Sequence, residues 1–216
     1  MKQFTINGTY QDNQLVKVED IQVELANGVY ILHTNGTLYT KDEWDTSWNS
    51  QAVGVAVKTD KCQFVIAPTE YQEIRQQHPD KVLIEGATVT SDLEVAKTDY
   101  NGLVNTQAGL TQIDPTEQCA ILVCGGYMFK NGKAGYLPAL GELLEARSFK
   151  NEVDSCMDLI GGTPLYSSDL ANAYKWSSTQ EAKNRAWYTQ WNLSYTAHAT
   201  KFTRFKSYCA RPFTTL

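Results

Sequence analysis

The chain has 216 residues, of which 42% are hydrophobic and 11% aromatic, and its formal net charge is −5. This apolar content predicts a folded core rather than disorder, and the acidic balance argues against nucleic acid as a partner. No apolar run approaches the roughly 18 residues of a membrane span, and the N-terminus lacks the apolar segment of a secretory signal. We therefore expect synthesis in the cytoplasm.

Cysteine and histidine usage predicts no metal site and no cofactor. The cysteines are odd in number, and no two have the C-x-x-C spacing of zinc and redox motifs. The three histidines are scattered along the chain, which argues against structural zinc. We interpret the following cysteines as buried free thiols: Cys62, Cys119, Cys124, Cys156 and Cys209.

The first part of the chain reads as β structure. Residues 1–26 contain short alternating apolar pieces and predict a β extension, separate from a main domain over 27–216. Turn signals at 27–28 and 35–36 then separate short apolar runs. We expect strands at 29–32, 38–39, 52–57 and 62–67.

Three carboxylates surround Trp44: Asp42, Glu43 and Asp45. Such a grouping can bind sugar or calcium, but a solvated loop is the favoured interpretation.

Helices are predicted in the middle of the chain. Residues 68–113 contain many breakers and are expected to be mostly loop with short strands. Asp114 followed by Pro115 and Glu117 is a good helix start, and a second helix is expected from Pro138. A third is expected over 151–160, with one apolar stripe. Strands before and after these helices predict an α+β fold in which the first and last core strands pair.

The last forty or so residues carry the strongest functional signal. Trp187, Thr189 and Trp191 alternate with Tyr188, Gln190 and Asn192. Period-two alternation predicts a strand with its tryptophans buried and its other face presented to solvent. Tyrosine beside Ser, Thr and Asn is typical of a paratope, whereas an ordinary solvated surface is rich in Lys and Glu. The pattern therefore favours recognition over catalysis.

A series of motifs then indicates a family. In chain order they are GVYILHTNGTLY, AVGVAV, DYNGLVNT, GYLPALGELLEA, DLIGGTPL, YKWSST and YCARPF. Over residues 28–213 this series resembles bacterial and phage proteins of the C-type lectin fold, in the branch that includes the variable proteins of diversity-generating retroelements. The resemblance implies an α+β domain in which two or three helices flank a small antiparallel sheet. It also implies that the last strands form a rigid binding surface, which retroelement members diversify.

The leading hypothesis is a ligand- or receptor-binding protein, such as an adhesin, on a phage virion or a bacterial cell surface. Its partner would be a protein or glycan on a cell surface. One alternative is a calcium-dependent carbohydrate-binding lectin, although the chain lacks the EPN or QPD tripeptide of that branch. Another is a structural pilus or tail component. Formylglycine-generating enzymes share the fold, but Cys156 and Cys209 are predicted on apolar faces, so we do not expect an enzyme.

The expected binding surface lies on the C-terminal strands and their loops. His198 is interpreted as a hydrogen-bonding group rather than a metal ligand. The sequence leaves the oligomeric state open, with residues 1–26 available to pair edge to edge with a neighbour. The residues expected to contact the ligand are Asn184, Arg185, Tyr188, Gln190, Asn192, Ser194, Tyr195, Thr196, His198, Phe202 and Arg204.

Overall fold

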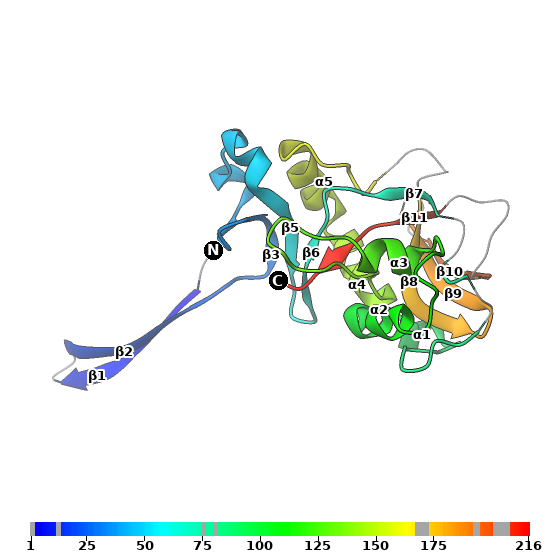
Figure 1. Cartoon of the computed structure of the whole chain (residues 1–216). Coiled ribbons are helices and arrows are strands. Elements are labelled where there is room, and N and C mark those ends of the chain that lie inside the picture. The colour runs from blue at the N-terminus through cyan, green and yellow to red at the C-terminus, as the bar shows by residue number, and fades with distance from the viewer. Residues whose placement is uncertain are drawn as a thin grey trace.

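The computed structural model describes residues 3–11, 14–74, 77–79, 82–166, 173–191, 195–200 and 208–216. Two five-stranded sheets and the helices around them form the body of the molecule, and a separate strand pair extends away from it (Figure 1). The fold is therefore α+β, as the sequence predicts. It contains two larger sheets where the resemblance implies one small antiparallel sheet.

The first sheet is antiparallel, with the strand order β12-β6-β5-β3-β4. Its strands are β3 (Gly28–His33), β4 (Leu38–Tyr39), β5 (Ala52–Lys58), β6 (Gln63–Ile66) and β12 (Phe213–Thr214). A Cβ atom on Gly54 of β5 would lie 2.3 Å from the Ile66 carbonyl oxygen of β6. Glycine is therefore required where these two central strands approach each other.

The helix α5 (Lys150–Leu159) covers one face of this sheet. Its Val153, Cys156 and Met157 are buried in one core with Ile31 and Val55 of the sheet. The apolar stripe predicted for 151–160 is thus confirmed. A second group of buried residues packs on the opposite face, around Phe129.

The second sheet is mixed, because β11 runs parallel to β8 while the other neighbouring strands are antiparallel. Its order is β10-β9-β8-β11-β7. The strands are β7 (Tyr71–Ile74), β8 (Tyr174–Ala182), β9 (Arg185–Gln190), β10 (Tyr195–Thr200) and β11 (Tyr208–Ala210).

The C-terminal segment joins the two sheets. β11 belongs to the second sheet and β12 to the first, and Arg211 and Pro212 lie between them. The prediction that the first and last core strands pair is wrong, because β12 pairs with β6 whereas β3 pairs with β4 and β5. The YCARPF motif is the crossover that ties the sheets together.

The remaining helices are short and lie mostly against the second sheet. They are η1 (Lys41–Glu43), η2 (Thr46–Gln51), α1 (Leu93–Ala96), α2 (Gly102–Leu110), α3 (Ala120–Gly125) and α4 (Leu140–Ser148). The expectation of mostly loop over 68–113 is wrong for α1 and α2. Glycine is a poor helix former, but a Cβ on Gly102 of α2 would lie 2.2 Å from Glu142 Oε2 of α4. Close packing of α2 against α4 therefore explains why Gly102 is present, although a glycine weakens the helical pattern of the sequence.

The helix predicted to begin at Asp114 begins instead at Ala120. The Asp114 carboxylate accepts hydrogen bonds from the backbone N–H and the hydroxyl of Thr116. It therefore closes a turn that is not continued into a helix. The helix expected from Pro138 is present as α4, and it begins two residues later.

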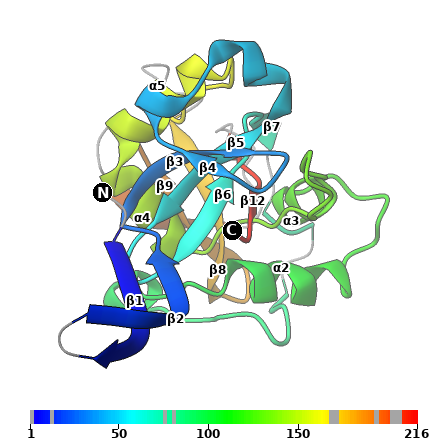
Figure 2. The ribbon, with the colours of Figure 1, turned by 90° about the vertical axis from the view of Figure 1, so that its left-hand side faces the viewer.

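β1 (Gln3–Gln11) and β2 (Gln14–Glu24) form a separate two-stranded antiparallel sheet, here called the N-terminal ribbon. Figure 1 shows it extending away from the body, and Figure 2 views the molecule from the ribbon's side. The link that follows the ribbon is held at the first sheet. The Lys58 ammonium donates to the Leu25 carbonyl, and the Tyr30 hydroxyl donates to the Ala26 carbonyl at 2.9 Å.

Candidate functional site

The face of β9 that the sequence predicts to be presented is buried. Tyr188 is 7% exposed and Gln190 is 5% exposed. Tyr188 lies opposite Trp176 of β8, and its ring centroid is 5.6 Å from that of Tyr174 and 5.1 Å from that of Tyr208. The expectation that Tyr188 and Gln190 face solvent is therefore wrong, because an aromatic core covers this face of the sheet.

The opposite face of β9 is buried as well. Trp187 is 4% exposed and packs against Leu140 of α4, while its indole N–H donates to the Thr90 carbonyl at 2.9 Å. Thr189 accepts a 2.6 Å hydrogen bond from Arg147 of α4. The prediction that Trp187 is buried is confirmed, and β9 lies between two packed layers.

Other predicted site residues lie at the rim of this sheet. Asn184 is exposed in the turn between β8 and β9, and Arg185 is half-buried. Arg185 Nη2 donates a hydrogen bond to Glu181 Oε1 at 2.9 Å, and Arg185 Nε lies 2.6 Å from Glu181 Oε2 as an ion pair. The two contacts hold the guanidinium beside the carboxylate. Thr196 of β10 is half-buried and lies opposite Thr189.

The remaining predicted residues are placed only in part. On β10, the backbone register pairs Tyr195 with Gln190 and His198 with Trp187. Four predicted residues lie outside the described part of the chain: Asn192, Ser194, Phe202 and Arg204. Of the predicted surface, the structure thus brings together only Asn184 and Arg185 at one turn, because Thr196 lies opposite Thr189 and Arg185 lies opposite Thr200.

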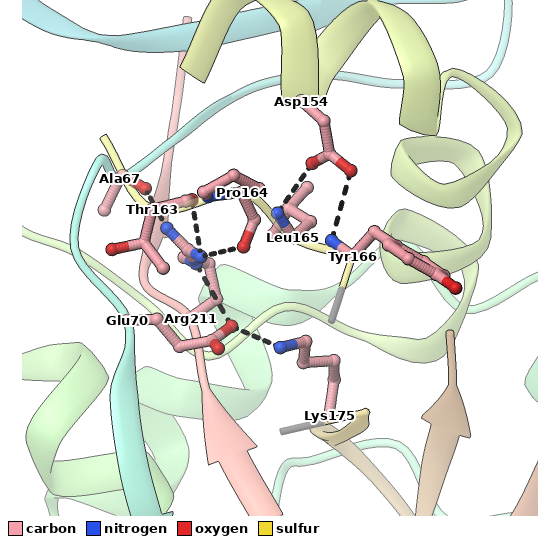
Figure 3. A network of polar contacts seen from close by, with 9 residues as sticks. All are labelled: Ala67, Glu70, Asp154, Thr163, Pro164, Leu165, Tyr166, Lys175 and Arg211. Atoms are coloured by element: carbon pink, nitrogen blue, oxygen red, sulfur yellow. Dashed lines mark hydrogen bonds and ion pairs between the residues drawn. The ribbon is translucent and has the colours of Figure 1, made fainter. Parts of the chain in front are cut away.

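Three of the sequence motifs meet in one buried network (Figure 3). Arg211 of YCARPF donates to the carbonyl oxygens of Ala67 and of Thr163 in IGGTPL, each at 2.9 Å. Its Nε also lies 3.3 Å from Glu70 Oε1, and the same oxygen accepts from Lys175 of YKWSST at 2.6 Å. The side chains of all three ionic residues are at most 2% exposed. The motifs therefore build a scaffold.

The same scaffold continues into α5. The Asp154 carboxylate accepts the backbone N–H groups of Leu165 and Tyr166 at 2.6 and 3.2 Å (Figure 3). Burial raises the pKa of Asp154, and these two hydrogen bonds oppose that rise. The chain after α5 is thereby fixed on both sides of Pro164.

A second polar cluster lies where α4 meets β8. Glu142 accepts hydrogen bonds from the Tyr136 hydroxyl at 2.9 Å and from the Ala139 backbone N–H at 2.7 Å. Burial raises the pKa of Glu142 to about 8 despite these donors. Nearby, the Thr179 hydroxyl of YKWSST donates to Asp99 at 2.7 Å and accepts from the Leu140 N–H. These groups position helix α4 on the sheet and have no access to solvent.

None of the five cysteines forms a disulfide, and four of them are buried. Burial raises the pKa of Cys62 and of Cys156 to about 11 and that of Cys209 to about 12. The thiolate is the nucleophilic form of cysteine. These thiols are therefore not activated at neutral pH. The interpretation as buried free thiols is confirmed for four cysteines, whereas Cys62 is only half-buried.

An aromatic cluster that sequence reasoning missed lies beside the first sheet. Its members are His33, Tyr39, Trp44 and Trp48, whose ring centroids are 5.1–6.2 Å apart. Two of the nearby carboxylates cap the 3-10 helices that carry the tryptophans. Glu43 accepts from the Thr40 N–H, and Asp45 accepts from the Ser47 N–H. Their capping role favours the solvated-loop interpretation over a calcium or sugar site.

Two surface grooves of about 340 Å³ each flank helix α5. One is lined by Lys150, Asn151, Asp154, Ser155, Asp158 and Tyr166, and the other by Val29, Lys41, Asn151, Glu152, Ser155 and Cys156. Several of their polar groups are already paired. The Lys41 ammonium donates to the Ser155 hydroxyl, and the Lys150 ammonium lies 5.1 Å from the centre of the Tyr166 ring.

A metal-ligand cluster and a membrane-spanning helix are both absent from the described residues. Within them, no three side chains of the His, Cys, Asp or Glu type are grouped in a way that would hold a metal ion. In the same part of the chain, no helix has the length and apolar character needed to cross a membrane.

Comparison with known proteins gives a likeness in fold. A solved structure of a fimbrial protein from Bacteroides ovatus superimposes with a TM-score of 0.54 at 11% sequence identity. The match covers 89% of this chain and 49% of the fimbrial protein, so this chain spans about half the length of that protein. No family model and no curated protein match the sequence. At this identity the likeness concerns the fold alone.

Proposed function

We propose that this chain is a subunit of a fimbria-like assembly on the surface of a bacterium. The observation that carries the proposal is the likeness in fold to the Bacteroides ovatus fimbrial protein over 89% of the chain. The N-terminal ribbon adds support, because a strand pair that extends away from its own body suits a protein that assembles with others. Of the alternatives drawn from the sequence, the structural pilus component is therefore preferred.

The location of the protein tests this proposal. Antibodies against the folded protein are applied to intact and to permeabilised source bacteria and followed by immunogold electron microscopy, with a deletion strain as the control. We expect label on intact cells, on filaments or on the cell surface. Label that appears only after permeabilisation contradicts the proposal, even if the purified protein self-associates in solution.

Recognition of a protein or glycan ligand is the second candidate function. Tyr188 and Gln190 cannot contact such a ligand, because both are buried. It retains the Arg185 guanidinium, whose side chain is 42% exposed and held in place by Glu181. A polar group fixed before binding loses little entropy when a partner arrives. The C-type lectin-like fold over 27–216, and the relation to retroelement variable proteins, belong to this candidate and stay predictions.

The second candidate is tested by a triple variant on a glycan array and on immobilised cell-surface protein. N184A/R185A/T196A should lose any binding that the wild-type protein shows, while circular dichroism shows that it stays folded. K183A, an exposed neighbour in the same turn, is the matched control. Equal binding by both variants would show that these residues do not form the binding surface.

Two further tests address the other predictions. Calorimetry with Ca²⁺ tests the lectin alternative, which requires Ca²⁺ binding. The retroelement origin requires a reverse transcriptase gene beside the gene for this chain.

A further inference from the structure

The N-terminal ribbon has one apolar and one polar face. In an antiparallel pair, residues directly opposite each other share a face of the sheet. One set of opposed pairs is Phe4 with Val23, Ile6 with Ile21, Gly8 with Val18, and Tyr10 with Leu15. The alternate set is Gln3 with Glu24, Thr5 with Gln22, Asn7 with Asp20, Thr9 with Lys17, and Gln11 with Gln14. The first set contains no charged side chain, and its one polar group is the Tyr10 hydroxyl; the second set contains no apolar side chain.

Two irregularities in β2 maintain this separation. The register shifts between Asn7 and Gly8 and again between Thr9 and Tyr10. Each shift leaves one residue of β2 without a directly opposed partner, first Glu19 and then Val16. Without such extra residues, Val18 and Leu15 would fall on opposite faces, because they are three positions apart. The ribbon therefore uses two bulges to keep its apolar residues on one face.

The ribbon stands apart from the other helices and strands that the structure describes. The two strands pair only with each other, and no other helix or strand makes extensive contact with them. The ribbon points away from the body (Figure 1). A lone two-stranded hairpin is at best marginally stable in water, whereas a second layer on its apolar face supplies a core.

We propose that this face packs against the same face of a second copy of the chain, so that two ribbons form a four-stranded, two-layered dimer contact. The face carries no charge, so two copies meet without burying an ion. Half-burial of seven large apolar side chains per copy removes on the order of 1,000 Å² from water. That area is at the lower end of specific interfaces, so we expect a dissociation constant on the order of micromolar. The inference rests on the ribbon's register and not on the proposed function.

Sedimentation equilibrium of the full chain between about 1 and 500 µM tests the dimer. The wild-type protein should pass from monomer to dimer over this range. I6E/Y10E adds two carboxylates to the apolar face of β1, and T5E/T9E adds the same charge to the polar face of the same strand. We expect I6E/Y10E to weaken dimerisation at least roughly 100-fold and T5E/T9E to leave it within a factor of a few. A wild-type protein that stays monomeric, or equal effects of the two variants, overturns the proposal.

Two further measurements keep the result unambiguous if the charged ribbon fails to form. I6T/Y10T retains β-forming residues but removes apolar area, and it should also weaken the dimer. A benzophenone amino acid in place of Ile21 should crosslink to residues 3–24 of a second copy, as mapped by mass spectrometry. Crosslinks confined to residues 25–216 would show that the ribbon docks on a body instead, and they overturn the face-to-face contact.

Discussion

β9 and the N-terminal ribbon are both alternating strands, yet their surroundings differ. β9 is enclosed, with Trp187 against helix α4 and Tyr188 in an aromatic core on the other face. The ribbon extends from the body, and its two strands pair only with each other. The distinguishing feature is charge. The only charged residue of β9 is Arg185 at its first position, and Ala186–Gln190 carry none, whereas the polar face of the ribbon includes Lys17, Asp20 and Glu24. A stretch of strand without charges on either face can be buried on both.

The largest expected effect comes from the network beneath the enclosed strands. Glu70→Ala leaves the buried cations of Lys175 and Arg211 without their carboxylate. Removing one partner of a buried ion pair costs about 3–5 kcal/mol, and we expect that loss in the free energy of unfolding, measured with urea. Glu94→Ala removes an exposed pair with Lys97 and should cost under about 0.5 kcal/mol. Similar losses in both variants would contradict the scaffold role.

Tyr188→Ala tests the burial of the second face of β9. The substitution removes a ring that packs against Tyr174 and Tyr208, and deleting a buried aromatic side chain costs about 3 kcal/mol. Asn184→Ala, in the exposed turn that precedes the strand, should change stability by less than about 0.5 kcal/mol. If Tyr188→Ala were as stable as Asn184→Ala, the ring would face solvent, as the sequence alone suggested.

Much of the fold is predictable from local pattern. Alternation and turn residues predict the positions of β3, β4 and β5 and the β character of residues 1–26. One apolar stripe predicts helix α5. Short strands and amphipathic helices carry this information within about ten residues of sequence. Pairing across long separations is not local, so the position of β12 beside β6 could not be derived from the sequence.

The candidate site was predicted less well, and the reason is specific. Alternation places Tyr188 on the face opposite Trp187, which is correct, but it does not say whether another layer covers that face. Solvent exposure depends on residues distant in sequence, such as Tyr208. Helix α2 was missed because Gly102 and Gly109, required for close contacts, weaken its helical pattern. Both errors come from tertiary packing overriding local preference.

The enclosed body should also lose stability as the pH rises. Burial raises the pKa of Glu142 from 4.5 to about 8, so the folded state binds a proton that the unfolded state releases above about pH 4.5. Stability from this group is full below pH 4.5 and is lost as the pH rises toward 8. We expect a loss of roughly 2 kcal/mol between pH 5 and 7. Glu142→Gln, which cannot ionise, should flatten this slope, and an unchanged slope would contradict the assignment.

The smallest change in the body's stability is expected from substitutions in the N-terminal ribbon. At a concentration where the chain is monomeric, I6E/Y10E should change the body's free energy of unfolding by less than about 0.5 kcal/mol. The reason is that the ribbon's strands pair only with each other and extend away from the two sheets. Urea unfolding followed by tryptophan fluorescence reports on the body alone, because the five tryptophans lie between Trp44 and Trp191. A loss comparable to that of Tyr188→Ala would mean that the apolar face packs on its own body, and the contrast between the ribbon and β9 would disappear.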